Sequence, residues 1–121
     1  MSDLIIPESM QRAYDNFHFA PARSHNGIVY CSGQIGSGDT AEEEFRNAWQ
    51  LVGKILEEAG LGFEHIIEFT SYHVGLQSHI GDFMKVKDEF LHAPYPAWTA
   101  IGITELAVPG ARVEIRVMAG K

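Results

Sequence analysis

The sequence predicts an α+β sandwich, in which a mixed β-sheet carries two helices packed on one of its faces. Two segments have apolar residues at helical spacing, and the segments around them are rich in β-branched and aromatic residues or alternate with a period of two. Their order is strand, strand, helix, strand, helix, strand, strand. A helix between two strands favours a right-handed crossover and parallel neighbours, whereas short turns favour antiparallel pairs. We expect residues 1–121 to form a single domain, since this length suffices to bury a core.

The N-terminal part predicts an extended arm followed by a hairpin. Residues 1–16 are mixed polar and are expected to be extended or loosely held. Residues 17–20 are expected to form a short strand, and the apolar residues 28–32 a buried one. Between them, Asn26 and Gly27 favour a turn with positive φ.

A glycine-rich loop follows over residues 33–38 and leads to the most regular helix. Its glycines let a ligand approach backbone N–H groups closely, although no helix opens from it with the spacing of a dinucleotide-binding motif. The helix is predicted over residues 40–59, where Thr40 and Glu43 form a capping box and apolar residues recur at helical spacing. Gly60 then provides the C-cap.

The second half predicts a strand, a shorter helix and two final strands. Residues 66–74 are rich in β-branched and aromatic side chains and predict the strand. After a loop at residues 75–78, residues 80–91 predict the helix, which two prolines end. The final strands, residues 97–103 and the segment from Val113 onwards, alternate with a period of two. We expect the Pro109-Gly110 turn to join them as a hairpin.

The last strand has one apolar and one charged face. Val113, Ile115 and Val117 must be buried, whereas Glu114 and Arg116 lie on the other side. Charges in such a pattern are usually solvated or paired with one another, and the functional alternative is that Glu114 lines a pocket.

Two helices cover only one face of the predicted sheet. We expect the other face to include Trp98, Met118 and part of residues 66–74, which makes it too apolar to remain in water. The simplest solution is a homo-oligomer that buries this face and forms clefts between subunits.

The composition excludes several classes of function. The net charge is −7 and no stretch concentrates Lys and Arg, which opposes nucleic acid or an anionic membrane as a partner. No apolar run approaches the roughly 18 residues of a membrane span, and the N-terminus lacks the pattern of a secretory signal. The single Cys31 fits a reducing compartment, so we expect a cytoplasmic protein. The histidines show no ligand-like spacing, so we expect no metal site.

Several segments along nearly the whole chain resemble the reactive intermediate deaminase family, also known as RidA, YjgF or endoribonuclease L-PSP. The matching segments are Ser32-Gly33-Gln34-Ile35, residues 55–61, residues 66–68, Tyr95-Pro96-Ala97, and Val113-Glu114-Ile115 followed by Ala119. The resemblance implies a chorismate-mutase-like (YjgF-type) sandwich assembled as a homotrimer with three interfacial clefts. It also implies hydrolysis of small-molecule enamines or imines, such as 2-aminoacrylate, to a 2-keto acid and ammonia, with no metal or organic cofactor.

The family's site residues carry over only in part. By resemblance, Gly33 matches the glycine whose backbone contacts the substrate, and Glu114 matches the glutamate that orients the attacking water. Trp98 stands where the family has the arginine that clamps the substrate carboxylate, and Phe19 stands where it has a tyrosine. Losing such a contact costs about 2–5 kcal/mol, so we expect poor activity on 2-aminoacrylate. Trp98 could instead stack on a flat or cationic ligand.

Three side chains near the matched motifs have alternative roles. Arg116 is either a displaced substrate-binding cation or a partner of Glu114 that lowers its basicity, and we favour the latter. The Ser32 hydroxyl is a candidate substrate contact without an evident base. Cys31 is either a thiol near the cleft or a buried hydrophobic residue, and we favour the latter.

Three functions remain open at the level of the sequence. The first is an enamine or imine deaminase whose substrate is not recognised through the usual arginine. The second is a non-catalytic trimeric module that binds a small-molecule ligand or regulates another enzyme. The third is the nuclease activity in the family's older name, which the acidic charge opposes.

Overall fold

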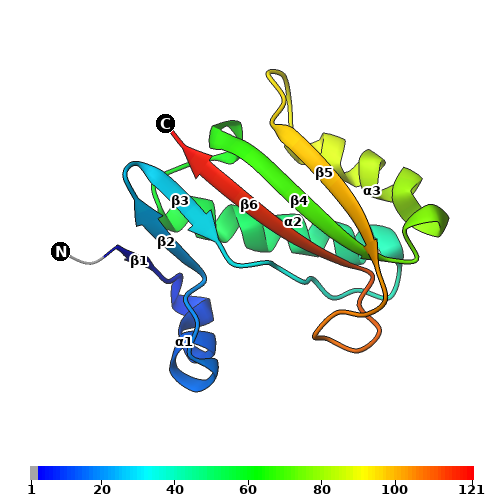
Figure 1. Ribbon diagram of the computed structural model, residues 1–121, viewed down its shortest axis with the longest axis horizontal. Helices are drawn as coiled ribbons and strands as arrows, with labels where there is room; N and C mark the ends of the chain where they lie inside the picture. The colour runs from blue at the N-terminus through cyan, green and yellow to red at the C-terminus, as the bar shows by residue number, and fades with distance from the viewer. Residues whose placement is uncertain (1–2) are drawn as a thin grey trace.

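The computed structural model describes residues 3–121 and confirms the predicted fold class. One mixed sheet has the strand order β1-β2-β3-β6-β4-β5, and two long helices, α2 and α3, cover one of its faces (Figure 1). The strands are β1 (Leu4–Ile5), β2 (Ala22–His25), β3 (Ile28–Cys31), β4 (Ile66–Val74), β5 (Ala97–Ile103) and β6 (Val113–Gly120). The helices are η1 (Glu8–Met10), α1 (Gln11–Phe17), α2 (Ala41–Glu58), η2 (Phe63–His65) and α3 (Leu76–Phe90).

The N-terminal arm is more ordered than predicted. β1 pairs with β2, and the short helices η1 and α1 fold back at one end of the sheet (Figure 1). His18 ends α1 in the left-handed conformation, with φ of 61°, so the predicted strand at residues 17–20 is wrong. The hairpin itself is confirmed: β2 and β3 pair antiparallel around Asn26 and Gly27, whose φ angles are 51° and 82°.

Helix α2 forms as its sequence predicts. The Thr40 hydroxyl accepts a hydrogen bond from the Glu43 N–H at 3.2 Å, and Gly60 follows the helix with φ of 76°. The apolar stripe, with Phe45 and Trp49 fully buried, packs on the sheet and on α3.

The second half confirms β4 and β5 and corrects their connections. Helix α3 begins at Leu76, four residues earlier than predicted, because Gly75 adopts φ of 77° and lets the chain turn directly into the helix. The expected C-terminal hairpin is wrong, since β4 lies between β5 and β6. The α3 crossover places β5 parallel to β4 at the sheet edge, and β6 runs antiparallel to both β4 and β3.

The two faces of the sheet differ in their surroundings. Val113, Ile115 and Val117 are at most 1% exposed beneath the helices. The opposite face carries Glu114, Arg116 and other alternate residues of the strands, and no helix of residues 3–121 packs over it (Figure 1). Over the same residues, no helix is both long and apolar enough to cross a membrane.

Candidate functional site

Gly33 and Glu114 lie in contact where the loop after β3 meets the start of β6. Gln34 N–H donates to the Ile115 carbonyl at 2.8 Å, and Ile115 N–H donates to the Gln34 carbonyl at 3.0 Å. This pair of hydrogen bonds pins the loop after β3 against β6. The Glu114 carboxylate consequently occupies the space that a Cβ atom on residue 33 would need. Only glycine at position 33 leaves the carboxylate where it is.

The contact between Gly33 and Glu114 combines a hydrogen-bond donor with an acceptor. Among the described residues, the Gly33 N–H makes no hydrogen bond. Glu114 is half-buried on the uncovered face, opposite Tyr72 of β4, and its carboxylate forms no ion pair with any residue from 3 to 121. A free backbone donor next to a free carboxylate can bind a polar small molecule and move a proton on it.

A buried glutamate fixes the start of β6. Glu44 of α2 is 3% exposed and accepts hydrogen bonds from Arg112 N–H and Arg112 Nη1, both at 2.7 Å, and from Val113 N–H at 3.3 Å. Glu44 was not among the residues predicted to matter for the site. Its spacing of four residues from the buried Ala48 was the available signal that it faces inward.

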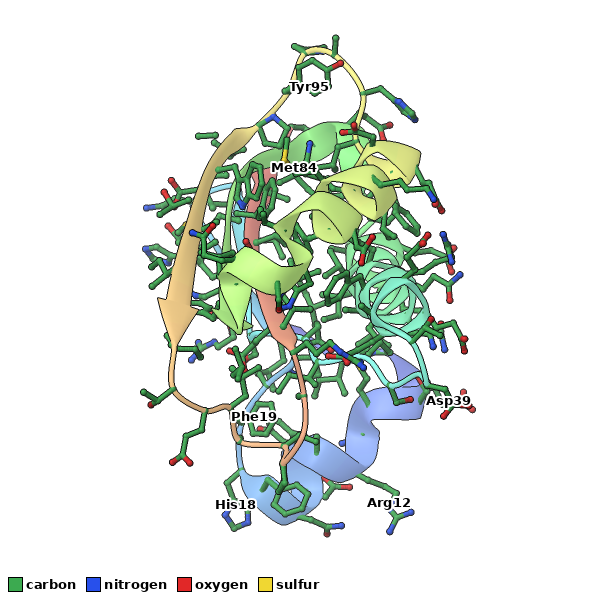
Figure 2. All side chains as sticks on the ribbon, turned by 90° about the vertical axis from the view of Figure 1, so that its right-hand side faces the viewer. Arg12, His18, Phe19, Asp39, Met84 and Tyr95 are labelled. Carbon is green, nitrogen blue, oxygen red and sulfur yellow. The ribbon has the colours of Figure 1, made fainter. Side chains whose placement is uncertain are left out.

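A pocket of about 270 Å³ adjoins Gly33 on the side of helix α1. We call it the α1 pocket. Besides Gly33, its apolar lining residues are Met10, Ala13, Phe19, Pro21 and Leu51. Its polar lining residues are Ser9 and Gln34. Phe19, predicted as a site residue, is 47% exposed and lies beside the end of α1, at the opposite end of the molecule from Tyr95 (Figure 2). The structure thus brings Phe19 and Gly33 to one pocket.

The family can now be assigned from comparison with known proteins. The model of the family described as Endoribonuclease L-PSP matches residues 10–121. The chain belongs to this RidA/YjgF family. The RutC family protein YjgH of Escherichia coli K12 is 35% identical over 122 residues, which cover 95% of this chain and 92% of that protein. A solved structure of protein YJGH superposes with a TM-score of 0.88 at 31% identity, covering 97% of this chain and 94% of that chain.

A relative in the same family has a named activity. The 2-iminobutanoate/2-iminopropanoate deaminase of Bos taurus is 33% identical over 96 residues, which cover 77% of this chain and 66% of that protein.

Trp98, which stands where the resemblance places an arginine, does not lie on the sheet face that carries Glu114. The parallel register places Trp98 beside Phe69 on the helix-covered face, whereas Glu114 is on the uncovered one. The indole stacks on Phe69, with ring centroids 5.5 Å and planes 11° apart, and Trp98 Nε1 donates to Ser71 Oγ at 2.8 Å. The placement of Trp98 on the uncovered face was therefore wrong, and within one subunit Trp98 and Glu114 lie on opposite faces of the sheet.

The partner of Trp98 belongs to a buried polar network that sequence analysis missed. Ser71 Oγ is 2.7 Å from His73 Nε2, and His73 Nδ1 is 3.1 Å from His79 Nε2. Because the indole N–H can only donate, the Ser71 hydroxyl is left to donate to a neutral His73. Burial lowers the pKa of His73 to about 4, and it also lowers the pKa of His79. The available signal was that Ser71 and His73 share the face of the apolar Phe69 when the strand alternates with a period of two.

The remaining predicted residues have mixed outcomes. The Ser32 hydroxyl donates to the Ala20 carbonyl at 2.7 Å, so this hydroxyl is engaged by the backbone. Arg116 is exposed on the same face as Glu114 but forms no ion pair within residues 3–121, so the favoured pairing with Glu114 is wrong. Cys31 is buried, which raises its pKa to about 12 and agrees with a hydrophobic role. Within the described chain, no cluster of three or more His, Cys, Asp or Glu could hold a metal ion.

Proposed function

We propose that this RidA/YjgF protein hydrolyses a reactive enamine or imine, other than 2-aminoacrylate, to a carbonyl compound and ammonia. The observation that carries the proposal is the contact of the Glu114 carboxylate with Gly33, since within residues 3–121 the carboxylate forms no ion pair and the Gly33 N–H makes no hydrogen bond. The names of the relatives 2-iminobutanoate/2-iminopropanoate deaminase support the same class of reaction. We further propose that a homotrimer covers the open sheet face and turns this contact into a cleft between subunits, in a cytoplasmic protein.

The reaction needs only water and proton transfers. Glu114 takes a proton from a water molecule as that water adds to the carbon of the protonated C=N bond, and the product is a carbinolamine. The carboxylic acid then returns this proton to the nitrogen, ammonia leaves, and the hydroxyl proton passes back to the Glu114 carboxylate as the carbonyl forms. The Gly33 N–H donates to a polar atom of the substrate and holds it against the carboxylate. No oxidant, metal or organic cofactor is required for these steps.

Recognition of an anionic group must differ from that of relatives with an arginine at position 98. A partly buried indole offers neither the charge nor the paired donors of a guanidinium. Arg116 is the candidate for a displaced cation, because it shares the face of Glu114 and its guanidinium is not ion-paired within residues 3–121.

Ammonia release from imines tests the proposal. A flavin-dependent amino-acid oxidase, with O₂ as the oxidant and catalase present, supplies imines of different amino acids in the assay. We expect Glu114→Gln to lower the rate by about 100-fold or more, the usual contribution of a general base. Glu58→Gln, which removes an exposed carboxylate from α2, serves as the matched control. Equal rates for wild type and Glu114→Gln would remove Glu114 from catalysis.

A non-catalytic binding module is the second candidate. The observation that favours it is the packing of Trp98 on Phe69 and its hydrogen bond to Ser71, which leave the family's carboxylate clamp without a replacement at its own position. In that case a small acid would raise the melting temperature of the protein without being consumed. Light scattering tests the trimer, and a monomer in solution would refute the inter-subunit cleft.

A further inference from the structure

We infer that the α1 pocket binds the hydrocarbon side chain of the substrate, so that the protein prefers imines with an aliphatic or aromatic side chain. This inference rests on the proposed function, because it names the substrate class for the same site. It concerns residues of α1 and its flanks, which are separate from Glu114.

The lining of the α1 pocket selects for apolar groups. Met10 and Ala13 come from the N-terminal helices, Phe19 and Pro21 from the connection to β2, and Leu51 from α2. None of the residues that line it is Lys, Arg, Asp, Glu or His. A charged side chain would lose its hydration there without gaining a partner, whereas a hydrocarbon would gain contacts.

The size of the α1 pocket limits the substrate. Its volume of about 270 Å³ equals the liquid volume of roughly nine water molecules. A side chain of about four to seven carbon atoms fits this space, which spans the leucine to phenylalanine range. The small side chain of Ala13 on α1 keeps the space open.

The α1 pocket shares one residue, Gly33, with the proposed reacting groups, and Glu114 itself does not line it. Gly33 lines the pocket, and the α-carbon of the same residue contacts the Glu114 carboxylate. A ligand that fills the pocket therefore reaches a residue in direct contact with Glu114. Its C=N group can lie over the free Gly33 N–H while its side chain stays among the apolar walls.

Filling the pocket tests the inference. Wild type should hydrolyse the imine of phenylalanine at least about 100-fold better in kcat/KM than the imine of alanine, since each methylene in such a pocket contributes about 10-fold or more. Ala13→Phe places a ring in the space and should lower that preference to below about 10-fold, with little effect on the alanine imine. Asn16→Phe adds the same ring at an exposed position of α1 that does not line the pocket, and should behave as wild type.

A second variant and a binding measurement separate the possible outcomes. Leu51→Ala enlarges the pocket and should shift the preference towards the bulkier imine of tryptophan. Unchanged preferences in both Ala13→Phe and Leu51→Ala, in protein that hydrolyses imines, would overturn the inference and leave the proposed function standing.

If wild type hydrolyses no imine, the proposed function fails and the pocket is judged by binding alone. The probe is 3-phenylpropanoate, which cannot react, and the readout is the shift in melting temperature. A shift in wild type and Asn16→Phe that is lost in Ala13→Phe supports the pocket. No shift in wild type, or an equal shift in Ala13→Phe, overturns it.

Discussion

Acid should destabilise the protein through the buried histidine network beneath α3. His73 is fully buried and its pKa is lowered from 6.5 to about 4, first by burial and then by its neighbour His79. In the unfolded chain His73 binds a proton below pH 6.5, whereas in the folded chain it does so only near pH 4. The stability that the neutral form contributes is therefore complete above pH 6.5 and is lost as the pH falls from 6.5 to 4.

The magnitude follows from the size of the pKa change. One pKa unit corresponds to about 1.4 kcal/mol, so a fall from 6.5 to about 4 corresponds to about 3 kcal/mol for His73. Burial lowers the pKa of His79 too, so its contribution has the same sign, although the Glu44 and Asp82 carboxylates oppose it and Arg112 adds to it. A loss of this size is a large fraction of the 5–15 kcal/mol typical of whole domains.

Urea unfolding at a series of pH values measures this loss. The free energy of unfolding should fall by about 3 kcal/mol or more in wild type between pH 7 and pH 4. In His73→Gln the buried titratable group is gone, so the fall over the same range should be clearly smaller. His92→Gln is the control, since it removes an exposed imidazole from the loop after α3. The reasoning would be refuted if wild type and His73→Gln lost stability in parallel.

Three further substitutions test the site and its supports. Gly33→Ala should lower kcat by about 100-fold with a small change in melting temperature, because the added methyl group displaces the Glu114 carboxylate; an unchanged kcat contradicts this. Glu44→Gln should cost about 1.5–3 kcal/mol in urea unfolding, because it weakens three hydrogen bonds to the start of β6, one of them from a guanidinium; a change below about 0.5 kcal/mol contradicts this. Thr40→Ala should cost about 1 kcal/mol through loss of the α2 N-cap, and stability equal to wild type would argue against that cap.

Strong local patterns were enough to predict most of the sheet and the long helices. β4 and β5 have the predicted bounds, because β4 is rich in β-branched and aromatic residues and the sequence of β5 alternates with a period of two. Helix α1 escaped prediction because it has only 7 residues and its N-cap Met10 makes no side-chain hydrogen bond. So short a helix depends on the folded protein around it and leaves little periodicity to detect.

The errors at the site came from non-local pairing. Alternation correctly put Trp98 and Thr99 on different faces of β5, but it does not say which face the helices cover. That depends on the neighbour Phe69 in β4, whose ring faces the core. Likewise, the Pro109-Gly110 turn was recognised locally, whereas the insertion of β4 between β5 and β6 is decided by the α3 crossover. The contact between Gly33 and Glu114 was inferred only by resemblance, because the residues are 81 positions apart in the chain.

The backbone bridge between Gln34 and Ile115 also bears on how such a protein can diversify. Two main-chain hydrogen bonds, rather than side-chain rotamers, hold the glycine against the glutamate, so replacement of nearby side chains leaves their spacing intact. The walls of the α1 pocket lie mostly on the N-terminal segment, which is attached to the rest of the protein through β1 and through hydrogen bonds from Ser32 to the main-chain carbonyls of Ala20 and Pro21. Exchanging residues 8–21 between relatives is therefore a route to altered ligand preference that leaves the contact between Gly33 and Glu114 unchanged.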